Sequence, residues 1–263
     1  MPLYDSIGKT YNFTRKADSR IVTALLKLLV CKPPSLIADI GAGTGNYSFA
    51  LAENGYRIDA LEPSAVMREQ ARNHPDISWT AGTAEDMPFQ NGVYTAVIST
   101  LAVHHFTSLD QGLQEMWRIL QPGGQLLLFT IDPRIQEKKC WIREYFGYFY
   151  PKAYSFLLPV GEMIRKVEQL SGNQADVVPF KLPPDFTDGV FHAGWQKPEL
   201  YLDRHFRQGI SVFAMVEEAV IIPMIEQLAH DLADGTWERK YGFVRYKPVY
   251  ESGFYFLSVN KDM

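Results

Sequence analysis

Three glycines stand at alternate positions directly after a short apolar run. The stretch LIADIGAGTGNY covers residues 36–47, and its glycines are Gly41, Gly43 and Gly45. Glycine permits a tight turn and lets a ligand contact bare backbone, and a helix that follows such a turn offers free N–H groups. We therefore interpret this loop as a place where backbone amides approach a nucleotide-like ligand.

Two acidic residues flank the loop. Asp39 lies just before Gly41, and Glu62 lies 17 residues after Gly45, at the end of the next predicted strand. A carboxylate at the tip of a second strand can accept hydrogen bonds from both hydroxyls of a ribose. The dinucleotide pattern G-x-G-x-x-G would place its last glycine at Asn46, so the early third glycine disfavours that class of ligand.

Hydrophobic patterning predicts the elements that position these residues. Apolar runs predict strands at 36–40, 56–62, 77–82, 94–100, 125–130, 175–182 and 253–260. Helical periodicity predicts helices at 19–30, 46–55, 64–74, 110–121 and 160–171. The alternation predicts an α/β fold, a doubly wound and mostly parallel seven-stranded sheet of Rossmann-like type. Open sheets of this kind bind ligands beyond the carboxyl ends of their strands, where the glycine loop lies.

The second half of the chain departs from this rhythm. Residues 134–158 are rich in aromatics, residues 183–211 look irregular, and a helical stretch over about 212–234 contains Pro223, which we expect to kink or split it. We predict one domain over residues 1–263. Its expected parts are an N-terminal helical cap at 1–30, a cofactor-binding core at 31–132, and helical or irregular lid insertions at 133–158 and 183–235.

Composition excludes several classes of function. The 263 residues carry a net charge of −4, so no basic footprint points to nucleic acid. Cys31 and Cys140 are too far apart for a metal motif or a disulfide framework. The longest apolar stretch, 21–30, is too short to span a bilayer and is interrupted by Lys27. We expect a cytoplasmic protein with no metal, membrane or nucleic-acid partner, and the oligomeric state stays open.

Four ordered motifs carry a family resemblance. The glycine loop, GTAEDMPF at 82–89, STLAVHHF at 99–106 and ILQPGGQLLLF at 119–129 resemble class I S-adenosylmethionine-dependent methyltransferases. The N-terminal stretch 4–21 is similar to that of the ubiquinone-type group, whose members methylate small molecules. The resemblance implies S-adenosylmethionine as cofactor and a small-molecule methyl acceptor as partner.

The same resemblance implies roles for individual residues. Asp39 and the backbone of 41–45 are expected to hold the methionine part of the cofactor, although Asp39 could instead brace the loop. Glu62, with Pro63 beside it, is expected at the ribose, Thr83 and Ala84 at the adenine, and Thr100 at the sulfonium. This implied set of cofactor-binding residues is Asp39, Gly41, Gly43, Gly45, Glu62, Pro63, Thr83, Ala84 and Thr100.

Two positions depart from the family pattern. The family usually has an aspartate at position 83, which binds the exocyclic amine of adenine, whereas Thr83 offers only a hydroxyl. That contact therefore passes to Glu85 or Asp86, or is weak. Thr95 also replaces an acid that commonly starts the fourth strand, and we derive no consequence from it.

Further candidates flank the expected cofactor. Tyr11 and Arg15 lie four residues apart and would share one helix face, from which Arg15 would pair with the cofactor carboxylate and Tyr11 would close over it. A surface turn is the alternative. His104 and His105 follow the fourth strand, where either could act as a general base or simply pack. His192 is a further histidine that could reach the site from the late insertion.

The expected reaction is transfer of a methyl group from S-adenosylmethionine to an oxygen, nitrogen or carbon atom of a small molecule by in-line displacement. Two alternatives stay open at this point. One is a non-catalytic protein that binds S-adenosylmethionine, and the other is an NAD-dependent oxidoreductase.

Overall fold

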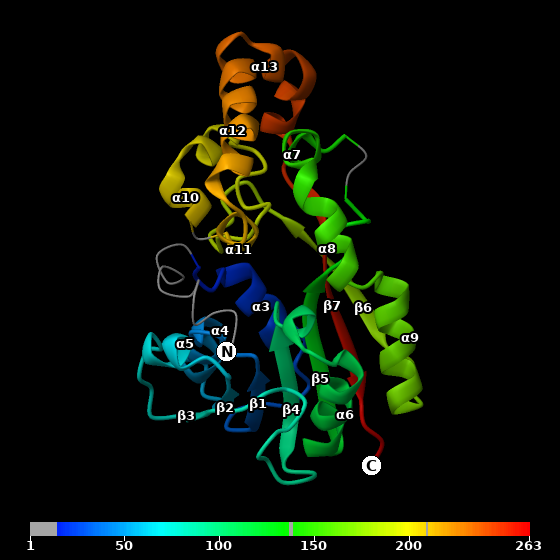
Figure 1. The fold of residues 1–263 in the computed structure, drawn as a ribbon. Coiled ribbons are helices and arrows are strands. Elements are labelled where there is room, and N and C mark those ends of the chain that lie inside the picture. Colours follow the sequence, from blue (N-terminus) through cyan, green and yellow to red (C-terminus); the bar gives the residue numbers. More distant parts are fainter. Residues whose placement is uncertain (1–14, 137–138, 209) are drawn as a thin grey trace.

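The computed structural model describes residues 15–136, 139–208 and 210–263, and Figure 1 shows their arrangement. A seven-stranded sheet forms the lower part in that view, with the order β3-β2-β1-β4-β5-β7-β6. The strands are β1 (Leu36–Ile40), β2 (Arg57–Leu61), β3 (Ile77–Thr80), β4 (Tyr94–Thr100), β5 (Leu120–Ile131), β6 (Asp176–Leu182) and β7 (Tyr250–Asn260).

Strand directions confirm the predicted sheet. Neighbours from β3 through to β5 pair in parallel, and only β7 runs antiparallel to its neighbours β5 and β6. Strand β1 lies between β2 and β4, so the chain order reverses beside it. Such a reversal opens a crevice at the carboxyl ends of the strands. The loop after β1 therefore begins at the position where this fold binds ligands.

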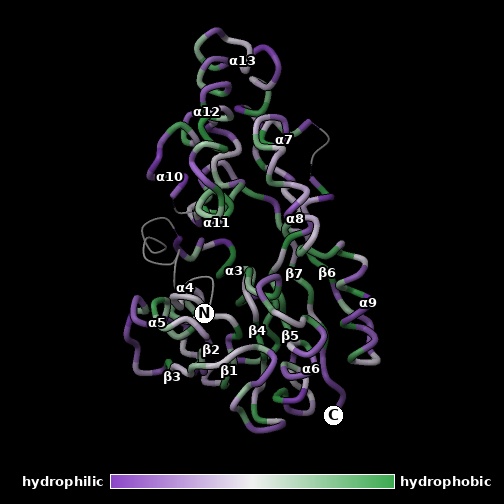
Figure 2. The backbone as a smooth tube through the Cα atoms, viewed as in Figure 1, coloured by the Kyte–Doolittle hydropathy of each residue, from purple (hydrophilic) through white to green (hydrophobic). Residues whose placement is uncertain are grey.

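Both faces of the sheet are covered, because successive residues of a buried strand point to opposite sides. Helices α3 (Ser19–Leu28) and α4 (Asn46–Ala52) contribute buried residues to one core cluster with Ile37 of β1. Helices α6 (Leu109–Ile119) and α9 (Val160–Ser171) contribute buried residues to the other cluster with Ala38 and Ile40, and the short helix α5 (Ala65–Glu69) follows β2. Figure 2 shows hydrophobic stretches along the central strands.

The insertions gather beyond the carboxyl ends of the strands, in the upper part of Figure 1. Their indole and phenol rings pack together, with Trp141, Trp195, Tyr201 and Trp237 fully buried, and this aromatic core is continuous with one sheet face. Their helices are α7 (Trp141–Tyr145), α8 (Tyr150–Phe156), α10 (Arg204–Gln208), α11 (Ser211–Ala214), α12 (Glu218–Ala233) and α13 (Thr236–Tyr241). Short 3₁₀ turns are η2 (Val103–His105), η3 (Gly147–Phe149), η4 (Pro198–Leu202) and η5 (Gly242–Tyr246).

Several predicted boundaries were wrong. The helical stretch over 212–234 breaks at 215–217, between α11 and α12, whereas Pro223 lies inside α12. Pro223 is the sixth residue of α12, so the helix continues past a proline, which ordinarily kinks or breaks a helix interior. Strand β5 begins at Leu120 rather than 125, because Leu120 pairs with Tyr94 and the residues QPGG form an irregularity in the ladder. Helix α5 ends at Glu69, short of the predicted 74.

Candidate functional site

The glycine loop has a backbone that side chains would disfavour. Gly41, Gly43 and Gly45 have φ values of 73°, 61° and 74°, which lie in the left-handed region. A Cβ on Gly41 would lie 2.5 Å from the Cβ of Ala102, and one on Gly45 would lie 2.6 Å from the Trp79 ring. The loop thus combines a left-handed backbone with close packing that only glycine allows.

Glu62 lies against this loop. Its Oε2 accepts a hydrogen bond from the Gly43 N–H at 2.9 Å, and its Oε1 accepts one from the Ser64 N–H, also at 2.9 Å. Ser64 in turn caps α5, because its side chain accepts a hydrogen bond from the Met67 N–H. The carboxylate at the end of β2 is therefore held in a fixed orientation next to the glycine backbone.

Asp39 lies behind the loop rather than in its wall. Its side chain is buried, and its Oδ2 accepts a hydrogen bond from the Ser48 hydroxyl at 2.5 Å. Its Oδ1 has no hydrogen-bond partner among the described residues. Burial, and to a lesser extent the nearby charge of Glu62, raises the pKa of Asp39 to about 6, although the hydrogen bond from Ser48 lowers it.

A groove of about 800 Å³ opens beside the loop. This volume suits a nucleoside-sized ligand. Most of the predicted cofactor-binding residues line it, so the fold brings together positions from four separate strand ends. The predicted residues in its wall are Arg15, Gly41, Gly43, Glu62, Pro63, Thr83, Ala84 and Thr100, together with His104 and His105.

The adenine-side segment carries the two acids that the sequence analysis considered, Glu85 and Asp86. Glu85 lines the groove, and its Oε1 accepts a hydrogen bond from the Ser108 N–H at 3.1 Å. Asp86 is not among the residues of the groove wall, and its backbone N–H bonds to the Thr83 carbonyl oxygen. Of the two acids considered as replacements for the missing carboxylate at position 83, Glu85 is thus the one beside the groove.

Thr100 and Leu101 mark the end of β4. The Thr100 hydroxyl is buried and has no hydrogen-bond partner among the described residues. Leu101 has a φ of 56°, which is unusual for a residue that is not glycine. It lines the groove, and no feature of the sequence had pointed to it. Strained backbone of this kind clusters at functional sites.

Arg15 forms an ion pair inside the protein. Its guanidinium binds the carboxylate of Asp188, which also accepts a hydrogen bond from the Tyr47 hydroxyl at 2.8 Å. All three residues line the groove. The predicted contact of Arg15 with a cofactor carboxylate stays a prediction, and Tyr11 lies outside the described residues. Asp188 and Tyr47 were both missed in the sequence.

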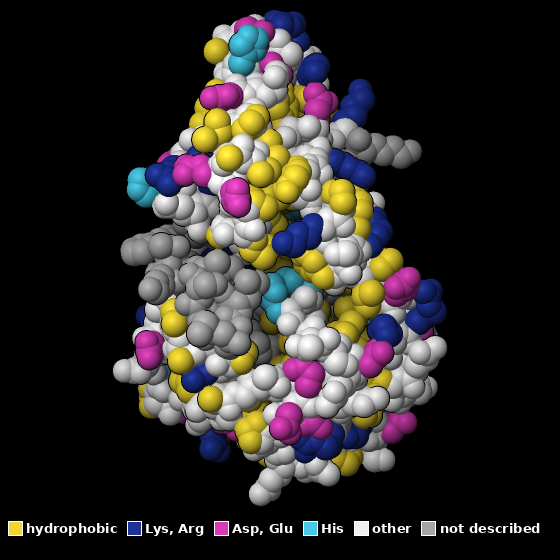
Figure 3. All heavy atoms as spheres, viewed as in Figure 1, with side chains coloured by type: hydrophobic (Ala, Val, Ile, Leu, Met, Phe, Trp, Pro, Cys, Tyr) yellow, Lys and Arg dark blue, Asp and Glu magenta, His cyan; other side chains and the backbone are white. Residues whose placement is uncertain are grey.

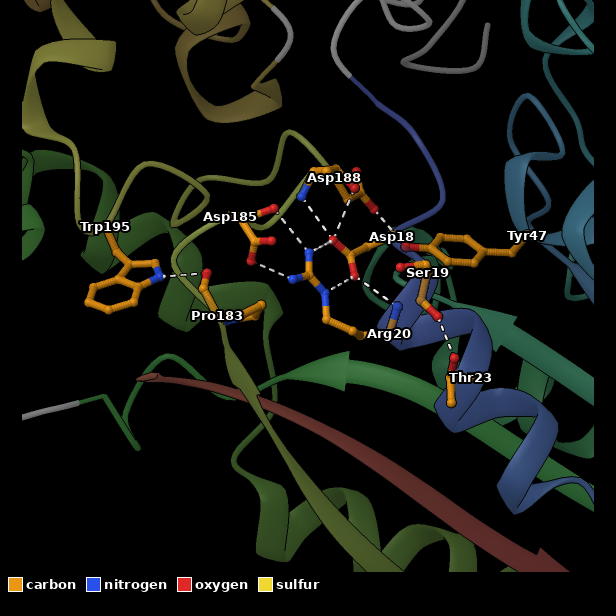
Figure 4. A network of polar contacts seen from close by, with 10 residues as sticks. Asp18, Ser19, Arg20, Thr23, Tyr47, Pro183, Asp185, Asp188 and Trp195 are labelled. Atoms are coloured by element: carbon orange, nitrogen blue, oxygen red, sulfur yellow. Dashed lines mark hydrogen bonds and ion pairs between the residues drawn. The ribbon is translucent and has the colours of Figure 1, made fainter. Parts of the chain in front are cut away.

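A second polar network joins the same two segments (Figure 4). Asp18 is fully buried and accepts hydrogen bonds from Arg20 and from both the N–H and the hydroxyl of Thr187. Burial alone would raise the pKa of Asp18, but these hydrogen bonds lower it to about 2. Arg20 also pairs with Asp185 at 2.5 Å. The N-terminal segment is thereby fixed to the loop that carries Asp188.

His104 and His105 lie in η2, beside the groove. Their ring centroids are 4.0 Å apart, and His104 stacks on Phe156. Burial, with the nearby Arg15 charge, lowers the pKa of His105 to about 4. Burial, His105 and Arg15 lower the pKa of His104 well below its usual range. Both imidazoles are therefore neutral near pH 7.

A smaller cavity of about 130 Å³ adjoins the groove. Arg15, Leu101, His104, His105, Phe156 and Met215 line both spaces. The space-filling view shows histidine side chains within the hollow between the upper and lower parts of the molecule (Figure 3). His192, from the late insertion, lines this smaller cavity and so lies beside the groove. The sequence analysis had named it as a histidine that could reach the site.

Two further features lie apart from these spaces. Among the described ranges, His230, Asp231 and Asp234 form the single group with the spacing of metal ligands, at the end of α12 and outside both cavities. No helix within those ranges is long and apolar enough to cross a membrane.

Comparisons with known proteins agree with this architecture. Residues 38–128 match the family model of a methyltransferase domain. A demethylmenaquinone methyltransferase of Beutenbergia cavernae is 30% identical over 139 residues, which are 50% of this chain and 58% of that protein. One of Chlorobaculum tepidum is 28% identical over 229 residues, covering 81% and 90%. The chain thus spans little more than half the length of the first curated relatives that it matches.

A solved structure matches nearly the whole chain. It is a protein of Anabaena variabilis described as a "putative methyltransferase from antibiotic biosynthesis pathway", with 40% identity, a TM-score of 0.90 and coverage of 94% of this chain and 98% of that one. A Haemonchus contortus phosphoethanolamine N-methyltransferase with bound S-adenosylmethionine, at 14% identity and a TM-score of 0.64, shares the fold. The chain belongs to the methyltransferases, as the family model and the relative of 40% identity both show.

Proposed function

We propose that the protein transfers a methyl group from S-adenosylmethionine to an oxygen, nitrogen or carbon atom of a small molecule. The observation that carries the proposal is the junction of two spaces. A groove built from the glycine loop and Glu62 opens onto a smaller cavity, and His104 and His105 line both. A donor in the groove and an acceptor in the cavity would meet there.

The chain's own residues fit the cofactor in several ways. The groove side of Gly43 is open apart from Met67, Glu62 offers carboxylate oxygens at the ribose position, and the buried hydroxyl of Thr100 in the groove wall has no partner among the described residues. We propose Thr83, Ala84 and Glu85 for the adenine side. When bound, the cofactor would supply a methyl group on a sulfonium: the acceptor atom would bond to the methyl carbon as the C–S bond breaks, and S-adenosylhomocysteine would leave.

Positioning and exclusion of water are the main contributions of the protein. The acceptor must lie in line with the methyl group, and orientation of two reactants is worth roughly 7–11 kcal/mol at best. The aromatic residues Phe149, Phe156 and Phe191 enclose the cavity and keep it apolar. The reaction releases one proton from an O–H, N–H or C–H acceptor, and this proton must leave the cavity.

His104 and His105 are the proposed acceptors of that proton. Both are neutral near pH 7, because burial lowers their pKa values, so each carries one unprotonated ring nitrogen. A weak base suits a proton that becomes acidic only as the acceptor atom gains the methyl group. A role in packing alone is the competing interpretation, and His104 does stack on Phe156.

The relatives support a small-molecule acceptor without specifying which one. Their names refer to quinone biosynthesis in some cases and to antibiotic biosynthesis in another. The net charge of −4 supports an acceptor other than nucleic acid. The two buried free thiols, Cys31 and Cys140, are compatible with the reducing conditions of the cytoplasm, where we propose that the enzyme acts.

Calorimetric titration tests the proposal. We expect S-adenosylhomocysteine to bind and NAD not to bind. Tight binding of NAD without a response to S-adenosylhomocysteine would overturn the proposal in favour of an oxidoreductase. Release of label from methyl-labelled S-adenosylmethionine in the presence of a metabolite extract then separates an enzyme from a protein that only binds the cofactor. Binding without transfer to any extract would favour the latter.

A further inference from the structure

We infer that His192 is a binding residue for the methyl acceptor, and that its Nδ1–H donates a hydrogen bond to an oxygen of an uncharged acceptor about the size of one ring. This inference deepens the proposed function and rests on it. It adds a polar recognition point within the apolar cavity, contributed by the insertion rather than by the sheet.

The first step concerns the proton on the His192 ring. The Tyr150 hydroxyl donates to Gln136 Oε1 at 2.8 Å, so the amide nitrogen of Gln136 faces His192. That nitrogen lies 2.8 Å from His192 Nε2. An amide N–H can only donate, so Nε2 accepts. A neutral imidazole carries one proton, which must then be on Nδ1.

The second step concerns the partner of that proton. His192 is buried, and its Nδ1 has no hydrogen-bond partner among the described residues. A buried donor without a partner costs free energy, so such groups are uncommon and require an explanation. Burial lowers the pKa of His192 to about 3, so the ring stays neutral and keeps a single N–H. Because His192 lines the cavity, a ligand oxygen there is a suitable partner.

The third step concerns charge and size. Arg15 is the one cationic side chain in the described wall of the cavity, and it is paired with Asp188. His104 and His105 are neutral there because burial lowers their pKa values. The cavity therefore has no net charge to offer an ionic acceptor. Its volume of about 130 Å³ is close to that of an apolar protein cavity that binds benzene.

The cavity also extends outward. A neighbouring groove of about 470 Å³ between α8 and α11–α12 shares Phe149, Ala153, Phe156, Val212 and Met215 with it. An apolar substituent on the ring would pass along these side chains. The polar end of the acceptor would then face His192.

Matched small probes test the inference on the full chain. Cyclohexanone and methylenecyclohexane have the same shape and differ in one carbonyl oxygen, and cyclohexylammonium adds a charge. Ligand-observed NMR titrations with and without S-adenosylhomocysteine should show that cyclohexanone binds about threefold to tenfold more tightly than methylenecyclohexane. Cyclohexylammonium should bind least. Equal binding of the two neutral probes would overturn the inference.

Variants at His192 test whether this residue causes the preference for cyclohexanone over methylenecyclohexane. His192→Phe should abolish it, whereas His192→Asn, which keeps an amide N–H near the Nδ1 position, should restore part of it. His205→Asn, at an exposed histidine, is the control and should behave as the wild type. Persistence of the preference in His192→Phe would assign it to another group and contradict the inference.

The ring proton itself can be observed in the wild-type protein, which removes the dependence on any variant's folding. Nitrogen-15 NMR should show His192 protonated on Nδ1 and unchanged from pH 5 to 8, and a proton on Nε2 would overturn the inference. Calorimetry with S-adenosylhomocysteine on the same samples separates a failure of the proposed function from a failure of the role of His192. Loss of that binding refutes the proposed function, whereas normal binding without an oxygen preference refutes only the role of His192.

Discussion

Arg15 and Asp188 are 173 positions apart in the chain and form a largely buried ion pair in the wall of the cofactor groove. Tyr47, the second residue of α4, donates a hydrogen bond to the same carboxylate. Asp188 therefore connects the N-terminal segment, the helix after the glycine loop and the late insertion. The wall of the groove on this side depends on one acidic side chain.

Asp188→Asn should destabilise the protein by about 3 kcal/mol, because the buried ion pair with Arg15 loses the charge of its carboxylate. Guanidinium unfolding measures the loss. Asp185→Asn is the matched control, since Asp185 pairs with Arg20 but is 78% exposed, and a surface pair contributes less than about 1 kcal/mol. Equal losses in the two variants would show that burial of the Arg15 pair has no energetic consequence.

Gly41→Ala should destabilise the protein more than Gly43→Ala. Both positions have a left-handed backbone, which costs an alanine roughly 1–2 kcal/mol. A Cβ at Gly43 meets only Met67 at an ordinary 3.5 Å, but one at Gly41 would lie 2.5 Å from the Cβ of Ala102. In guanidinium unfolding, we expect Gly41→Ala to lower the free energy of unfolding by about 1–3 kcal/mol more than Gly43→Ala does.

The double variant Gly41→Ala with Ala102→Gly isolates this clash. It should recover most of the additional loss, because the colliding methyl group is absent, while the cost of the left-handed backbone stays. A double variant no more stable than Gly41→Ala would mean that the collision with Ala102 is not the cause.

The sequence predicted those site residues whose position follows from local patterns, and missed those whose role depends on residues distant in the chain. The glycine loop, Glu62 and the histidine pair lie at strand ends, and apolar runs in a single sequence already locate strand ends. Asp188 and Leu101 carry no such signal. The role of Asp188 depends on a partner 173 residues away, and the φ of Leu101 depends on packing at the end of β4. The break between α11 and α12 was misplaced, because α12 continues through Pro223 and the interruption falls at 215–217, where the sequence has no proline.

Glu62→Gln should weaken binding of S-adenosylhomocysteine by about tenfold to a hundredfold. The carboxylate accepts hydrogen bonds from the Gly43 and Ser64 N–H groups, and we propose that it also accepts them from the ribose. An amide loses one acceptor oxygen and the charge, and hydrogen bonds to charged groups are worth about 1.5–3 kcal/mol. Calorimetry measures the affinity, with Glu69→Gln, at an exposed position of α5, as the control. Unchanged affinity in Glu62→Gln would remove Glu62 from the site.

Asp39→Asn should stabilise the cofactor-free protein at pH 8 and have little effect near pH 4. Burial raises the folded-state pKa of Asp39 from 3.8 to about 6, so the stability that its protonated form contributes is present below pH 3.8 and is lost as the pH rises through 6. That rise corresponds to about 3 kcal/mol at most. Asparagine carries no charge at any pH, so the variant avoids this loss. Thermal unfolding from pH 4 to 8 should show a stability difference between Asp39→Asn and the wild type that grows up to about pH 6 and then levels off.

Ser48→Ala should act in the opposite direction, since Ser48 donates the hydrogen bond that favours the ionised carboxylate. A difference between Asp39→Asn and the wild type that does not vary with pH would mean that Asp39 does not titrate with a raised pKa.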